Sequence, residues 1–179
     1  FYKPAYAHFE PLMTPAVKAA MTAIKKSIKD EGGGIVSAEL ALYYSVVPAE
    51  TLDQLIAVTA DAGPMKQALE KTRYYDADDW KAFDKLRPQL ITVFKFLEAI
   101  HFHAYWQTEV RPDVEKHATE LQTQLGRYNI IPLQEGILGH ALPSNRITVY
   151  LLHYVLPHGI RITGTRFLTG EPYPMQIVL

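Results

Sequence analysis

Arg146-Ile-Thr-Val-Tyr-Leu-Leu-His-Tyr-Val-Leu156 is the stretch that decides the fold, because here the hydrophobic pattern changes from a helical period to a period of two. Residues 147, 149, 151, 153 and 155 share one face of the predicted strand, and the residues between them share the other. Both faces are largely apolar or aromatic. We therefore expect the strand to be covered on both sides and to form the surface on which the upstream helices pack.

Further strands are predicted on the carboxyl side of this stretch. The chain turns at Pro157-His158-Gly159, and the segment from Ile160 to Leu168 favours one or two short strands paired with the first. Most of the upstream sequence has a helical period. The prediction is an α+β fold in which a predominantly helical region, residues 1–127, packs on a small β-sheet near the C-terminus. Residues 128–179 supply a short helix and the strands, and the two regions form one continuous unit.

Local signals mark the helices of the first hundred residues. Thr14-Pro15 predicts an N-cap followed by proline at the first helical position, and Gly32-Gly33-Gly34 stops that helix. Three further helices are predicted, at residues 36–47, 49–60 and 65–74.

The longest helical run is predicted to open at Asp76 or Asp78 and to continue to about Glu109. Pro88 lies inside this run, where it predicts a break or a kink just before it. Arg111-Pro112-Asp113 restarts the chain, and helices follow at residues 114–125 and 132–142.

Composition excludes several classes of function. The chain has 179 residues and a net charge of -1, which gives no general attraction to nucleic acid. It has no apolar run of about 18 residues, so no membrane span is expected. Cysteine is absent, which excludes disulfides and thiolate sites and leaves the compartment open. A start at Phe1 without methionine is compatible with an exported bacterial protein whose signal peptide has been removed, and the apolar finish at Leu179 suggests a longer natural chain.

Histidines are the only obvious candidates for metal ligands in this sequence. His101 and His103 are two residues apart in a predicted helix, where side chains at that spacing point in nearly opposite directions, so separate structural roles are favoured over chelation. His153 and His158 flank the end of the main strand and are weak candidates for a shared metal. Packing and loop roles are favoured for them because no third ligand is evident. The sequence contains neither G-x-S-x-G nor H-E-x-x-H, and no catalytic residue is assigned.

The segment from about Tyr128 to Leu179 resembles the part of zincin-type metallopeptidase domains that lies just upstream of the active-site helix. The features that carry the resemblance are a short helix, the strand with Ile147-Thr-Val-Tyr-Leu, the turn Pro157-His158-Gly159-Ile160, the polar strand Arg161-Ile-Thr163 and the apolar approach Tyr173-Pro-Met-Gln-Ile-Val-Leu179. They cover about fifty residues.

The resemblance implies a zinc-dependent peptidase whose H-E-x-x-H helix would follow Leu179. This chain alone would hold no zinc and would not be catalytic; it would contribute the upper sheet of the cleft. An edge strand at Ile162 to Phe167 would pair with an extended peptide substrate. The exposed side chains of this strand at the cleft would be Thr163, Thr165 and Arg166. An ordinary solvated hairpin edge is an equal interpretation of these residues.

Two other functions remain open. The first is a non-enzymatic helical binding or scaffolding module, which predicts an exposed apolar groove or a stable oligomer and no bound metal. The second is a small-ligand site between aromatic helices, which predicts a closed apolar pocket. The residues proposed to line that pocket are Tyr43, Tyr44, Trp80, Phe94, Phe102 and Trp106.

Overall fold

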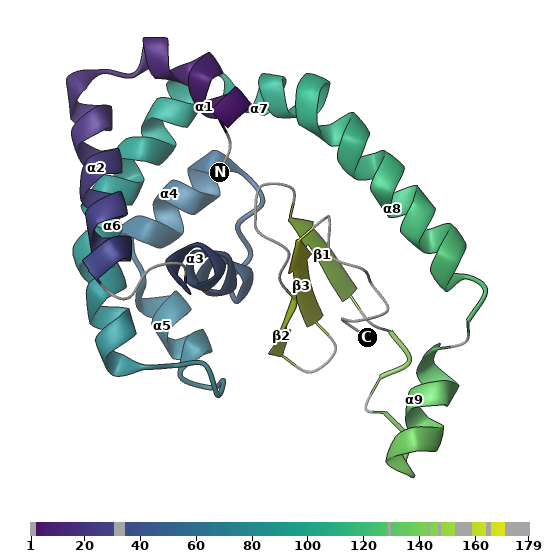
Figure 1. Ribbon diagram of the computed structural model, residues 1–179. Coiled ribbons are helices and arrows are strands. Elements are labelled where there is room, and N and C mark those ends of the chain that lie inside the picture. Colours follow the sequence, from purple (N-terminus) through teal and green to yellow (C-terminus); the bar gives the residue numbers. More distant parts are fainter. Residues whose placement is uncertain are drawn as a thin grey trace. The chain divides into compact units, whose positions relative to one another are not determined.

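The chain divides into two compact units, Phe1–Ala104 and Tyr105–Leu179. The computed structural model describes residues 3–30, 35–128, 130–142, 144–146, 148–152, 159–163 and 166–170. Within these ranges the chain is predominantly helical, as predicted from the sequence (Figure 1). The sequence-based boundary between residues 127 and 128 falls within the second unit.

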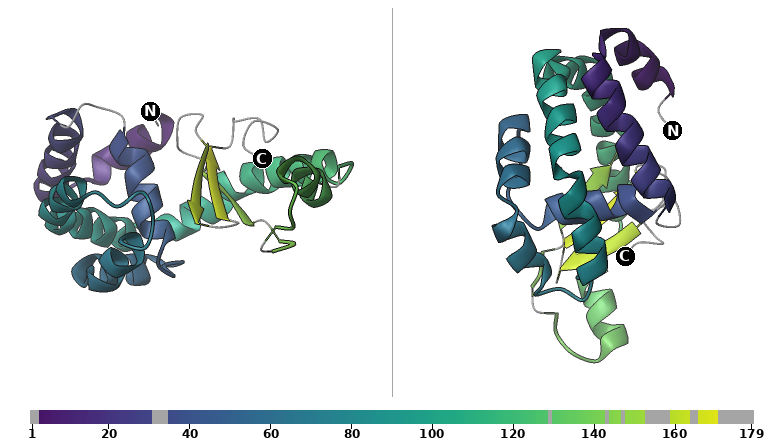
Figure 2. Two further views of the ribbon diagram at one scale, coloured as in Figure 1. Left: turned by 90° about the horizontal axis from the view of Figure 1, so that it is seen from below. Right: turned by 90° about the vertical axis from the view of Figure 1, so that its left-hand side faces the viewer.

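The first unit is built around its longest helix, α6 (Ala77–Ala99), which packs against α2 (Pro15–Asp30) and α4 (Leu52–Ala60). Figure 2 shows α2 and α6 side by side along much of their length. The remaining elements of this unit are α1 (Lys3–Phe9), the 3-10 helix η1 (Glu10–Leu12), α3 (Ile35–Ser45) and α5 (Gly63–Leu69). The helix α7 (Phe102–Tyr105) ends at the boundary between the units.

One face of α6 is buried. Trp80, Phe83, Leu86 and Leu90 recur every three or four residues, and each is at most 9% exposed. This spacing places them on one side of the helix, so they leave water together when α6 packs. The first unit therefore takes its core from its own helices. The prediction that the helices pack on the strand at residues 146–156 is not needed to explain their burial. Where the structure describes side chains in this unit, the others that are buried are Phe9, Val17, Ala20, Leu42, Tyr43, Thr59, Ala62, Met65, Leu69 and Phe96.

Side-chain caps fix three helix starts. The Thr14 hydroxyl accepts a hydrogen bond from the Val17 amide at 3.3 Å, which confirms the cap predicted for α2. The Asp76 carboxylate accepts from the amides of residues 78 and 79, which confirms Asp76 as the start of α6. At α4, Thr51 and Gln54 form a reciprocal capping box. The helix therefore begins at Leu52, not at residue 49.

A break or a kink was predicted at Pro88, and the break is wrong, because α6 runs through this position without interruption. Pro88 lies on the exposed side of the helix, whereas Leu86 and Leu90 lie on the buried side. Because proline has no amide hydrogen, one carbonyl of the helix loses its donor. On the exposed side water can hydrogen-bond to that carbonyl, so the loss costs little. The packing of the opposite face is then enough to keep the helix continuous.

The predicted continuation of this helix to Glu109 is also wrong, since α6 ends at Ala99. His101 has a φ of 54°, in the left-handed region, and its amide donates to the Glu98 carbonyl at 2.9 Å. A left-handed residue just after a helix, bonded in this way, is a common helix stop. Glycine usually occupies such a position, so a histidine there did not indicate from the sequence that the helix ends.

The second unit begins with a wide helical turn. The π-helix η2 (Trp106–Val110) leads directly into α8 (Arg111–Leu125), and the Arg111 amide donates to the carbonyl of Trp106, five residues back. In a regular α-helix the ring of Pro112 would clash with the carbonyl four residues before it, and a wider turn relieves this clash. The predicted restart at Arg111 is thus a change of helix type.

The helix α9 (Ile130–Leu138) and three short strands follow, β1 (Thr148–Leu152), β2 (Gly159–Thr163) and β3 (Arg166–Gly170). They pair in the order β1-β3-β2, with β1 parallel and β2 antiparallel to β3. The second half of the long predicted strand, residues 153–156, lies outside the described residues. Tyr150 is 39% exposed, so the prediction that both faces of the strand are covered is wrong at this position.

Gly136 inside α9 and Gly139 directly after its last residue make a matched pair for a stability test. A Cβ added at Gly136 or at Gly139 meets no atom within 4 Å, but Gly139 alone has a positive φ, of 71°. We expect Gly136→Ala to stabilise α9 by about 0.5–1 kcal/mol and Gly139→Ala to destabilise it by a similar amount or more. Hydrogen exchange of the α9 amides measures both. Equal effects of the two substitutions would contradict the left-handed helix end.

Candidate functional site

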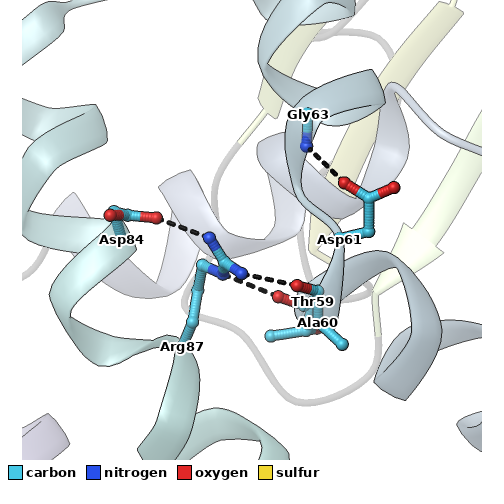
Figure 3. A network of polar contacts seen from close by, with 6 residues as sticks. All are labelled: Thr59, Ala60, Asp61, Gly63, Asp84 and Arg87. Atoms are coloured by element: carbon cyan, nitrogen blue, oxygen red, sulfur yellow. Dashed lines mark hydrogen bonds and ion pairs between the residues drawn. The ribbon is translucent and has the colours of Figure 1, made fainter.

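The densest polar network in the described part of the first unit surrounds Arg87 of α6 (Figure 3). Its Nε donates to the Thr59 carbonyl at 2.7 Å, and its Nη2 donates to the Ala60 carbonyl at 2.6 Å. Its Nη1 donates to the Asp84 carboxylate, also at 2.6 Å. The two carbonyls are the last of α4, where a helix leaves carbonyls unpaired and its dipole is negative. Arg87 therefore works as a cap supplied by another helix.

Tyr44 and Thr59 extend the network into the core. Their hydroxyl oxygens are 2.6 Å apart, and the Thr59 hydroxyl also donates to the Leu55 carbonyl at 2.5 Å. Burial raises the pKa of Tyr44 above its ordinary value of 10.0, while the hydrogen bond to Thr59 and the charge of Arg87 act in the opposite direction. The phenol thus stays neutral at physiological pH and serves as a hydrogen-bonding group, not as a base.

This polar network stabilises the fold and has no catalytic role. Three donors of the guanidinium are already engaged, two of them by backbone carbonyls that cannot leave without uncapping α4. No buried side-chain nitrogen or oxygen in the described part of the chain lacks a hydrogen-bond partner. Sequence reasoning missed this network because Arg87 contacts residues 27 and 28 positions away, and no local pattern signals such a contact.

Asp53 of α4 and Glu98 of α6 form a pair of carboxyl groups on the exposed surface. The pKa of Glu98 is raised above its ordinary value of 4.5 by a hydrogen bond to Asp53 and by the negative charge of Asp53, and Lys95 partly offsets the shift. Asp53 lies in the first turn of its helix and Glu98 in the last turn of its own. The helix dipole stabilises a negative charge in the first turn and destabilises one in the last turn. The unfavourable member of the pair is therefore Glu98.

This pair predicts a pH dependence of stability. Because the folded state raises the pKa of Glu98, it binds the proton more tightly than the unfolded chain does. The stabilising contribution is present below the ordinary pKa and is lost as the pH rises through the raised one. We expect Glu98→Gln, which can donate to Asp53 at any pH, to raise the melting temperature near neutral pH and to have little effect near pH ~4.

Thermal unfolding followed by circular dichroism at several pH values measures this effect. Glu120→Gln, on the exposed surface of α8, is the matched control and should leave the profile unchanged. Parallel profiles for Glu98→Gln and the unaltered chain would contradict the carboxyl pair.

The aromatic residues expected to line a ligand pocket instead pack on one another. The rings of Tyr43 and Trp80 are 6.0 Å apart, and Tyr44 meets Phe94 edge-on at 5.6 Å. Phe102 contacts Phe9 at 5.6 Å. Tilted and edge-on pairs at these distances are the ordinary geometry of an aromatic core. Trp106 belongs to the other unit, so the six residues do not form one described cluster.

The histidines form no described metal site. His101 lies in the turn after α6, and His103 lies in the short helix α7. Among the described residues there is no group of three or more histidine, aspartate or glutamate side chains that could hold a metal ion. His153 and His158 lie outside the described residues.

The predicted substrate-binding residues separate in the sheet. Thr163 ends the edge strand β2, and Thr165 lies outside the described residues. Arg166 opens β3, the central strand, where it is in register with Thr148 on one side and Thr163 on the other. Arg166 therefore does not lie at the edge, contrary to the sequence-based expectation. The role of these residues in substrate binding stays a prediction.

Comparison with known proteins gives no further assignment. No family model, no curated protein and no solved structure matches this chain. No helix among the described residues is long and apolar enough to cross a membrane.

Proposed function

We propose that this chain is the upstream, non-catalytic part of a zinc-dependent peptidase-like protein, and that its strands form the upper side of a substrate cleft. The observation that supports this proposal is the order of elements after residue 130. A short helix, α9, is followed by β1 and then by an antiparallel pair whose outer member, β2, lies at an edge of the pairing order. An edge strand has backbone groups with which an extended peptide can pair.

The sheet's part in this function is to hold a peptide in an extended form. A substrate strand beside β2 would be oriented by backbone hydrogen bonds, so recognition would depend on the shape of the peptide more than on its sequence. In the peptidase family that this segment resembles, an H-E-x-x-H helix holds the zinc. We expect that helix to follow Leu179, where the metal would activate water for attack on the peptide carbonyl.

The gene sequence after Leu179 is the first test. We expect H-E-x-x-H within roughly thirty codons of Leu179, on the helix that follows. The protein extended to include that helix should bind zinc in equal molar amount and cleave unfolded peptides. Its glutamate-to-glutamine variant should keep the zinc and lose the cleavage. A downstream sequence without the motif would overturn the proposal.

A second candidate function is a non-enzymatic binding or scaffolding module. It is supported by the large apolar side chains that α9 exposes, Leu133, Ile137 and Leu138. Metal analysis of the extended protein separates the two functions, because only the peptidase binds zinc.

A further inference from the structure

The pairing of β2 with β3 is irregular at one end. Arg161 stands opposite Phe167, but the next pair is Thr163 with Arg166. Ile162 is therefore an extra residue on β2, which makes this irregularity a β-bulge. In a pairing without the bulge, Ile162 would itself stand opposite Arg166. The bulge thus sets a hydroxyl-bearing residue beside the arginine in place of an apolar one.

The neighbour of Arg166 on the other side is also a threonine. β1 runs parallel to β3, with Thr148 in register with Arg166. Residues directly opposite each other on neighbouring strands share a face of the sheet and are separated by about 5 Å. Thr148, Arg166 and Thr163 therefore lie in one line across all three strands, which we call the Thr-Arg-Thr row. The row lies at the end of the sheet where β1 and β3 begin and β2 ends.

The face that carries this row is open to solvent on β1. Tyr150 is two residues after Thr148 and therefore lies on the same face. The side chain of Tyr150 is 39% exposed, and Thr148 is half-buried. A small molecule in solution can therefore reach the row from its β1 end.

The sequence around the sheet is positively charged. Residues 136–170 contain three arginines, at positions 146, 161 and 166, and neither lysine, aspartate nor glutamate. Since the whole chain has 18 basic and 19 acidic residues, the rest of it has 15 basic and 19 acidic ones. The sheet region is thus the cationic part of a chain that is otherwise acidic, and a positive region of this kind attracts anions.

We propose that the Thr-Arg-Thr row, which the β-bulge brings together, binds an oxyanion, the carboxylate or phosphate group of a ligand. A guanidinium has five donors in a planar fork that matches two oxygens of such a group, and a threonine hydroxyl supplies a further donor. A β-bulge often occurs beside a binding site, where it redirects a residue. This proposal does not rest on the proposed peptidase function.

Nuclear magnetic resonance titration of the full chain tests the proposal, with potassium phosphate in one arm and potassium acetate in the other. Ionic strength is held constant, because salt screens the general attraction of a cationic region. We expect saturable shifts of the backbone amides of Thr148, Thr163 and Arg166, with a Kd of about 1–10 mM. The amides of Leu152 and Gly170, at the other end of the sheet, should shift little. The arm that saturates at the lower concentration identifies the class of oxyanion.

A matched control lies on the opposite face of the same sheet. Arg161 stands opposite Phe167, which alternates with Arg166, so Arg161 and Arg166 are on different faces. Arg166→Gln should weaken binding by about tenfold or more, because it removes charge-assisted hydrogen bonds. Arg161→Gln removes the same charge and should weaken it by less than about twofold.

Thr163→Val preserves the shape of the side chain and should weaken binding by about two- to tenfold, since it removes one neutral hydrogen bond. It tests the row in a second way if Arg166→Gln disturbs the sheet, which the β1 and β3 amide resonances of the free variants would show. Equal effects of the two arginine substitutions would overturn the proposal, and so would unchanged binding by Thr163→Val. Shifts that fail to saturate by about 50 mM in both arms would also overturn it.

Discussion

Replacing Phe83 with alanine is expected to lower the free energy of unfolding of the first unit by about 3–5 kcal/mol. Phe83 is 3% exposed, and its ring lies 5.1 Å from both Tyr43 and Trp80. The substitution removes the buried ring and leaves a cavity that α3 and α6 cannot easily close. Since a domain of this kind is stable by only about 5–15 kcal/mol, the loss is a large share of the total.

Urea unfolding measured through Trp80 fluorescence tests this prediction. A Trp106→Phe background leaves Trp80 as the one tryptophan, because the chain has two. Phe83→Leu refills most of the volume and should cost about 1–2 kcal/mol. Leu12→Ala, at an exposed position, should stay within about 0.5 kcal/mol of the parent. A loss below about 1 kcal/mol for Phe83→Ala would show that the aromatic side chains do not form the core.

Replacing Arg87 with methionine is expected to destabilise the first unit by about 2–3 kcal/mol. Methionine preserves most of the aliphatic packing, but it leaves the carbonyls of Thr59 and Ala60 without their donor. Arg87→Lys should recover part of the loss, because an ammonium keeps the charge at the end of α4 but cannot reproduce the planar fork of donors.

Asp84→Asn is the control that separates the helix cap from the ion pair. The Asp84 side chain is 53% exposed, so its pair with Arg87 should contribute less than about 1 kcal/mol. Hydrogen exchange should locate the effect of Arg87→Met at the last turn of α4. Equal losses for Arg87→Met and Asp84→Asn would contradict the cap, since the ion pair would then account for the whole effect.

The sequence by itself determined the features that depend on a few neighbouring residues. The caps at Thr14 and Asp76 were predictable because each side chain accepts from an amide two or three positions away. The capping box at Thr51 and Gln54 could be recognised in the same way, from a threonine followed three residues later by glutamine. The helix was nevertheless predicted to start at residue 49, before this motif. The helical character of the first unit followed from its apolar period.

The tertiary structure decided everything that depends on contacts between distant segments. Pro88 leaves α6 continuous because the opposite side of the helix is packed, and packing outweighs one lost hydrogen bond. Arg166 lies on a central strand because β3 pairs on both sides, which the polar pattern of its segment did not reveal. Arg87 caps a helix that ends 27 residues earlier in the chain. Caps and periodicity are local interactions, whereas strand order and inter-helix hydrogen bonds exist only after the chain has brought distant residues together.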